Sequence, residues 1–102
     1  MSEAKKESVT VEFTGPFRDA TGERRVELQL PQKHATLRDV INVLSEKYGK
    51  NFLDRTHGAH HKLGETTMIL VNGKIVMDES ELDATIVPEG SRIVFMIPLS
   101  GG

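Results

Sequence analysis

The sequence predicts an α+β fold in which a mixed sheet of about five strands carries one main helix on one of its faces. Three observations support this prediction. Apolar and polar residues alternate in segments 9–14 and 26–30, which is the period of half-buried strands. Segment 36–49 has apolar residues at helical spacing, and two further apolar runs, 68–71 and 92–97, follow it. A single helix among strands has to bury its apolar stripe against the sheet they form.

The first two strands are expected to form an antiparallel hairpin with a wide turn. Residues 9–14 read Val-Thr-Val-Glu-Phe-Thr, and residues 26–30 repeat the alternation before Pro31 ends the run. Between them, residues 15–23 contain two glycines and a proline, so we predict that this segment is a loop.

The helix has a recognisable start and end. Thr36 followed by Asp39 is a variant of the capping box, in which each side chain satisfies a free backbone N–H group at the start of a helix. Gly49 stands where a left-handed residue would end the helix. The residues expected to form the apolar stripe are Leu37, Val40, Ile41, Leu44 and Tyr48.

Residues 50–66 have no clear period. We predict that residues 51–53 form a short turn whose apolar side chains plug the core, and that residues 56–65 form a mobile, solvated loop. This loop contains His57, His60 and His61, a cluster that could bind a metal. No carboxylate or cysteine completes an obvious ligand set, and zinc sites need three or four placed ligands, so we predict no metal site.

The last strands are apolar on both alternating sets. Residues 68–71 end at Asn72-Gly73, a strong hairpin signal, so residues 74–76 are expected to return as a short strand. Pro88 to Ser91 should turn the chain into a final strand over residues 92–97. Central strands that are covered on both faces have this composition, yet only one helix is available. The second face is therefore expected to be exposed and apolar, or covered by a partner that docks on Met68, Leu70 and Phe95 or their neighbours.

Composition restricts the classes of function. The chain has 102 residues, with 13 basic and 15 acidic residues mixed along it and a net charge of -2, so we expect no nucleic-acid partner and no binding to anionic membranes. It has no cysteine, which excludes disulfides and thiolate chemistry. No stretch approaches the roughly 20 apolar residues of a membrane span, and we expect a cytoplasmic protein. Residues 1–8 are expected to be a disordered leader, 9–97 one domain, and 98–102 a flexible tail.

The tail has the composition of a thin, extended arm, with the sequence Pro98-Leu99-Ser100-Gly101-Gly102. Pro98 ends the strand and stiffens the exit, Leu99 offers one apolar anchor, and the last three residues have almost no side-chain bulk. Fully extended, the five residues span about 17 Å. Such an arm could carry its terminal carboxylate into a narrow site of another protein.

Several motifs, taken in order, resemble one family. The chain is similar to ubiquitin-like β-grasp proteins, in the group of the small subunit of molybdopterin synthase, the thiamine sulfur carrier and the small archaeal modifier proteins. The resemblance runs from Val9 to Gly102. The residues that carry it are Val9-x-Val11-x-Phe13, Phe17-Arg18-x-Ala20-Thr21-Gly22, Ala35-Thr36-Leu37-x-Asp39, Val71-Asn72-Gly73, Pro88-x-Gly90 and Ile97-Pro98-Leu99-Ser100-Gly101-Gly102.

The resemblance implies a fold and a chemistry. The first and last strands would lie side by side and parallel in the centre of the sheet. An adenylating enzyme that uses ATP and magnesium would activate the Gly102 carboxylate next to Gly101, and would recognise the tail through Pro98, Leu99 and Ser100. The activated carboxyl group would then be charged with sulfur as a thiocarboxylate. This sulfur would be donated with a sulfurtransferase large subunit to make molybdopterin for the molybdenum cofactor, or would serve tRNA thiolation. Alternatively, the carboxyl group would be joined to a lysine of a target protein.

Three functions stay open at this point. Sulfur carriage is the leading interpretation, and conjugation to protein lysines is a close second. The third is a non-covalent interaction module that uses the sheet face and has an incidental tail. In none of these is the chain an enzyme by itself, because the sequence shows no Ser-His-Asp set, no phosphate-binding glycine loop and no paired carboxylates.

Overall fold

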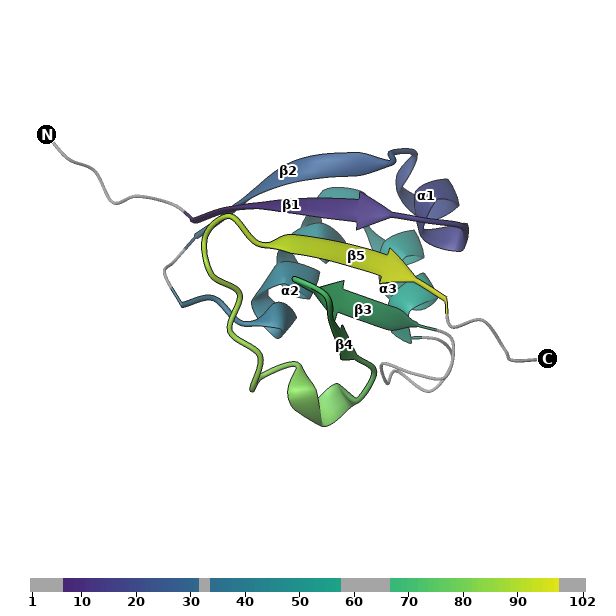
Figure 1. Ribbon diagram of the computed structural model, residues 1–102. Helices are drawn as coiled ribbons and strands as arrows, with labels where there is room; N and C mark the ends of the chain where they lie inside the picture. The colour runs from purple at the N-terminus through teal and green to yellow at the C-terminus, as the bar shows by residue number, and fades with distance from the viewer. Residues whose placement is uncertain (1–6, 32–33, 58–66, 98–102) are drawn as a thin grey trace, which may run out of the picture.

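The computed structural model describes residues 7–31, 34–57 and 67–97, and within them one mixed sheet of five strands (Figure 1). The strand order is β2-β1-β5-β3-β4. The sequence prediction of an α+β fold with a mixed sheet is therefore confirmed. The strands are β1 (Glu7–Phe13), β2 (Arg25–Leu30), β3 (Met68–Val71), β4 (Lys74–Val76) and β5 (Arg92–Met96).

The centre of the sheet is a parallel pair formed by the first and last strands. β1 runs parallel to β5, with Val11 opposite Ile93 and Phe13 opposite Phe95. All other neighbours are antiparallel: β2 on β1, β3 on β5, and β4 on β3. β1 begins at Glu7, inside the segment predicted to be a disordered leader, because residues 7 and 8 already pair with β2.

The main helix, α2 (Leu37–Tyr48), begins as the sequence predicts. The Thr36 hydroxyl accepts a hydrogen bond from the Asp39 N–H at 3.2 Å, and the Asp39 carboxylate accepts one from the Thr36 N–H at 2.9 Å. Gly49 follows the helix with φ 85° and ψ -163°, so it has the expected positive φ but not the left-handed helical conformation. The Gly49 N–H nevertheless donates a hydrogen bond to the Ser45 carbonyl at 2.7 Å, so it closes the last turn of the helix.

The predicted loop over residues 15–23 is wrong, because a short helix, α1 (Pro16–Thr21), occupies most of it. Pro16 stands at the first helical position, where its fixed φ suits a helix and its missing N–H costs nothing. Gly22 ends the helix in the left-handed conformation, with its N–H bonded to the Arg18 carbonyl at 2.7 Å. α1 is held to the domain by Phe17, which is fully buried.

The short turn predicted at residues 51–53 is part of a further helix, α3 (Lys50–His57). The expectation that this segment plugs the core is confirmed for Phe52, whose side chain is fully buried. His57 is the last residue of α3, whereas His60 and His61 lie outside the described residues.

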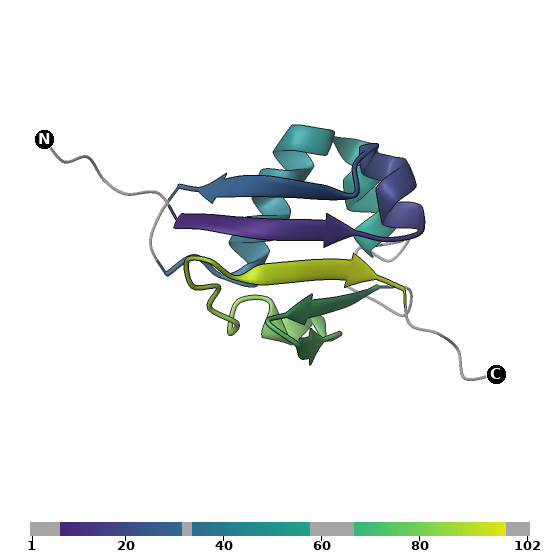
Figure 2. The same cartoon turned by 45° about the horizontal axis from the view of Figure 1, so that its top comes forward.

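The core lies between one face of the sheet and the helices. α2 and α3 cover the same face, and no described element covers the opposite one (Figures 1 and 2). At the end of the sheet nearest α1, four buried phenylalanines form a cluster. In it the Phe95 ring lies 5.4 Å from Phe52, 5.8 Å from Phe17 and 6.0 Å from Phe13, measured between ring centroids. Among the described residues, no helix has the length and apolar character of a membrane span.

The chain between β4 and β5 is fixed to α2 by ion pairs of Arg38. A 3-10 helix, η2 (Glu79–Glu81), follows β4, and Arg38 of α2 pairs with Glu79 at 3.1 Å and with Asp83 at 2.8 Å. The β3–β4 hairpin turns at Asn72-Gly73, as predicted, with positive φ at both residues. The Asn72 side chain accepts a hydrogen bond from the Arg92 N–H at 2.9 Å, so the hairpin is anchored to the start of β5.

Candidate docking face and C-terminal exit

The uncovered face of the sheet is divided into an apolar half and a polar half. The apolar half, called here the apolar half-face, is built on β3, β4 and β5. Leu70 of β3 lies opposite both Ile75 of β4 and Val94 of β5, and Met68 lies opposite Met96. Side chains at paired positions share a face of the sheet. The apolar half-face consists of Met68, Leu70, Ile75, Val94 and Met96.

Burial confirms which side chains point away from the core. Met68, Leu70, Val94 and Met96 are half-buried, and Ile75 is 53% exposed. The intervening residues of β3 and β5 are buried against the helices. The structure thus places an apolar surface where a partner is predicted to dock.

The prediction that Phe95 belongs to the docking face is wrong. Phe95 is 0% exposed and belongs to the phenylalanine cluster inside the core. Its neighbours Val94 and Met96 occupy the open face instead. Residues 93–97 are apolar at every position, so their alternation could not assign a face. The pairing of Phe95 with Phe13 of β1, whose own alternation is clear, is the signal that would have assigned it.

The polar half of the open face lies on β1 and β2, with Arg92 of β5 beside it. The Arg92 guanidinium donates to both Glu12 carboxylate oxygens, at 3.0 and 2.9 Å. This hydrogen-bonded pair, aided by the positive charge, holds the pKa of Glu12 below its ordinary value. Thr10 donates from its hydroxyl to Glu27 at 2.9 Å. A partner that buries the apolar half-face would therefore meet a hydrophilic border along β1 and β2.

The exit of the chain toward its C-terminus is closely held. The Phe95 carbonyl accepts hydrogen bonds from the Thr14 N–H at 3.1 Å and from the Thr14 hydroxyl at 3.0 Å. Ile97, the last described residue, is 40% exposed. The predicted activation residues Gly101 and Gly102, and the tail residues Pro98, Leu99 and Ser100, lie outside the described residues.

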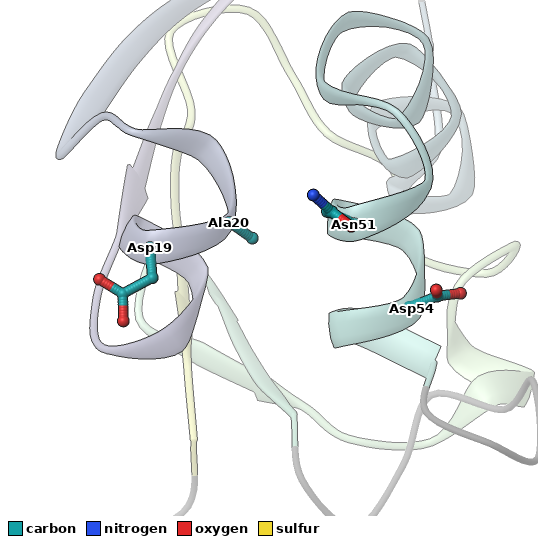
Figure 3. A pocket seen from close by; sticks show the side chains of 4 residues that line it. All are labelled: Asp19, Ala20, Asn51 and Asp54. Carbon is teal, nitrogen blue, oxygen red and sulfur yellow. The ribbon is translucent and has the colours of Figure 1, made fainter.

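A hollow of about 440 Å³ opens between α1 and α3, lined by Asp19, Ala20, Asn51 and Asp54 (Figure 3). The side chains of Ala20 and Asn51 face each other across it, whereas the carboxylates of Asp19 and Asp54 do not converge on a common point. In the described part of the chain, no group of three His, Asp or Glu side chains is placed to hold a metal ion. We assign no ligand to the hollow.

Comparison with known proteins gives one family and one fold. The model of the ThiS family matches residues 11–102. No curated protein matches the sequence. SAMP1 of Haloferax volcanii is a structural neighbour with a TM-score of 0.75 and 21% identity, covering 93% of this chain and 99% of the neighbour.

Two further solved structures agree. A Pyrococcus furiosus protein provisionally described as molybdopterin converting factor, subunit 1, has a TM-score of 0.70 and 23% identity, with 91% of this chain and 99% of that chain covered. Urm1 of Trypanosoma brucei has a TM-score of 0.65 and 19% identity, with 98% and 100% covered. These likenesses establish the β-grasp fold, with one main helix on a five-stranded sheet.

Proposed function

The chain belongs to the ThiS family, and we propose that it is a carrier protein whose Gly102 carboxylate is adenylated by an activating enzyme and then converted to a thiocarboxylate. The observation that carries this proposal is the extent of the family match. It runs from β1 through the central strand β5 to the last residue, so it includes Gly101 and Gly102.

The chemistry explains why a partner enzyme is needed. A carboxylate is a poor electrophile, because its negative charge and its resonance both disfavour attack by a nucleophile. An oxygen of the Gly102 carboxylate attacks the α-phosphate of ATP, a new P–O bond forms, and pyrophosphate leaves. A sulfide nucleophile then attacks the carbonyl carbon, the bond to AMP breaks, and the thiocarboxylate remains. ATP and magnesium belong to the activating enzyme, and this chain supplies the acyl group.

Residues 98–102 are the arm that brings the carboxylate to the enzyme. Glycine has no side chain, so Gly101 and Gly102 can pass through a channel too narrow for other residues and allow close approach of the enzyme's backbone. Pro98, Leu99 and Ser100 are the residues the enzyme would recognise ahead of them.

The apolar half-face is the surface on which we place the activating enzyme. It includes β5, the strand that leads directly into the arm, so a partner seated there would lie next to the arm's origin. Contiguous apolar surface of this kind in a soluble domain marks a site of protein contact. Docking would remove Ile75 and its neighbours from water, while the polar half stays at the rim.

Conjugation is a second use of the same adenylate. Neighbours from Haloferax volcanii and Methanosarcina acetivorans are small archaeal modifier proteins. If a lysine amine attacks the carbonyl carbon in place of sulfide, AMP leaves, the amine loses a proton, and an isopeptide bond joins the two proteins. Both outcomes need the same activation step.

Intact mass spectrometry after incubation with ATP and a lysate of the native host tests the proposal. A gain of about 16 Da, from replacement of oxygen by sulfur, identifies the thiocarboxylate. A gain of a whole protein mass identifies conjugation.

The Gly102→Ala variant is the control for the site of chemistry, and should lose most ATP–pyrophosphate exchange. Near-normal exchange by this variant would contradict the proposal. A chain lacking residues 101 and 102 that keeps both its partners and its activity would show a non-covalent binding module instead.

A further inference from the structure

Thr14 follows β1 and contacts the end of β5 across the parallel pair. Its N–H and its hydroxyl both donate to the Phe95 carbonyl, at 3.1 and 3.0 Å. The residue opposite Phe95 in the register is Phe13, so Thr14 adds its contacts where the parallel ladder ends. β1 and β5 run side by side to the end of the sheet beside α1 (Figures 1 and 2).

The side chain of Phe95 is fixed from the other direction. Its ring packs against Phe17 of α1 and Phe52 of α3, with centroids 5.8 and 5.4 Å away, and is fully buried. The ring of Phe95 is therefore held by packing in the core, and its carbonyl is held by the hydrogen bonds from Thr14. Met96 still pairs with Met68 of β3, and Ile97 comes next with 40% of its surface exposed. Among the residues that the structure describes, Phe95 is thus the last one that is buried.

We propose that Thr14 is a positioning residue for the C-terminal arm, because its two hydrogen bonds fix the point and the direction from which the chain leaves the sheet. This inference rests on the proposed function, in which the arm must reach the enzyme's active site from a body docked on the apolar half-face. Loosening the end of β5 would add a residue that has to be ordered each time the arm is inserted. A small tilt at the origin also becomes a larger displacement at the tip of a five-residue arm, which spans about 17 Å when fully extended.

Thr14→Val removes the hydroxyl and keeps the β-branched shape and the backbone N–H. The test is single-turnover adenylation with the activating enzyme in excess, followed through the acyl adenylate. Positioning acts after docking, so the half-saturating enzyme concentration should stay unchanged. The maximal rate should fall about fivefold, which is the factor that corresponds to the free energy of one hydrogen bond. Thr14→Ser, which keeps the hydroxyl, should restore the rate. A loss of folded protein would lower the amplitude of the reaction and leave its rate constant unchanged.

Thr10→Val is the matched control. Thr10 lies on β1, the strand that leads into Thr14, and Thr10→Val also removes one side-chain hydrogen bond, to Glu27, but Thr10 pairs with Arg92 and not with Phe95. We expect this variant to react at the wild-type maximal rate, because Thr10 lies at the rim of the proposed docking surface and a change there would alter only the half-saturating enzyme concentration. A Thr14→Val rate equal to that of the Thr10→Val control, or a loss that Thr14→Ser does not restore, would overturn the inference. If the wild-type chain is not adenylated, both the proposed function and this inference are refuted. If the wild-type chain is adenylated and Thr14→Val reacts at the normal rate, only the role of Thr14 is refuted.

Discussion

Ile75→Thr tests the apolar half-face by making one of its most exposed side chains polar. Ile75 lies on the edge strand β4 and is 53% exposed, so about half of its side chain is still available for contact with a partner. Threonine keeps the β-branch and suits a strand equally well. The substitution should therefore lower the free energy of unfolding by about 1 kcal/mol or less, which is too little to unfold a typical domain, and should weaken the docking of a partner.

The size of the effect follows from the exposure of the side chain. Full burial of an isoleucine side chain is worth about 1.5–3 kcal/mol, and the 53% that is still exposed can gain about 0.8–1.6 kcal/mol on docking. Threonine retains part of this gain through its methyl group. Affinity for the activating enzyme should fall about threefold to tenfold.

Ile86→Thr is the matched control, because Ile86 is 48% exposed but lies on the connection before β5 and pairs with Thr36, outside the five strands. The dissociation constant of each variant is measured by titration calorimetry with the activating enzyme, and folding is checked by urea denaturation. Ile86→Thr should bind within about twofold of wild type. If the two variants lose equal affinity, or if Ile75→Thr loses none, the enzyme does not dock on the apolar half-face.

Three further predictions concern the fold. Phe52→Ala should lower the free energy of unfolding by about 4 kcal/mol in urea titrations, because it leaves a cavity within the phenylalanine cluster, while Asn51→Ala on the exposed side of α3 should change it by less than about 0.5 kcal/mol. Thr36→Ala should cost about 1 kcal/mol in the same titrations through loss of the capping box, and an unchanged midpoint would contradict that role. Arg92 lowers the pKa of Glu12. The contribution of Glu12 to stability is therefore complete above its ordinary pKa of 4.5 and is lost as the pH falls through the lowered pKa. In acid titrations that follow the free energy of unfolding, Glu12→Gln should lose less stability over this pH range than wild type.

The elements that the sequence predicts well are those with repeated signals. The period of α2 is supported by its capping box, and the β3–β4 hairpin is supported by Asn72-Gly73, so several independent features agree on each element. The parallel pairing of β1 and β5 came from the resemblance to a family. Alternation alone gives no direction of pairing between strands that are far apart in the sequence.

The two missed helices are too short for periodicity to be visible. α1 has six residues and buries one phenylalanine, Phe17, so only its flanking signals were available: Pro16 at the first position and Gly22 after the last. α3 has eight residues, mostly polar, and reaches the core through Phe52 and Thr56. Their helical state depends on packing against each other and against the sheet, which a local pattern does not contain.

The assignment of the docking face shows a related limit. Met68 and Leu70 lie on the open face, but Phe95 does not, since an uninterrupted apolar strand has no polar side to mark its orientation. Orientation became visible only through the register with neighbouring strands. The hypothesis that the C-terminal carboxylate is activated rests on the sequence of residues 98–102 and not on the structure. It depends on the small side chains of these residues and on their place after β5.

The parallel pairing of β1 with β5 also sets the order of events during synthesis. Glu12 and Arg92, joined by two hydrogen bonds, are 80 positions apart in the chain, and no shorter fragment contains both. A nascent polypeptide cannot close the middle of its sheet until the final strand has left the ribosome. Truncated products that lack this strand would leave β1 and β3 without their shared neighbour and expose unpaired edges to proteolysis and aggregation. Under the proposed function, only a chain whose translation has passed β5 could present the Gly102 carboxylate, so the strand that completes the sheet is also the strand that leads into the arm.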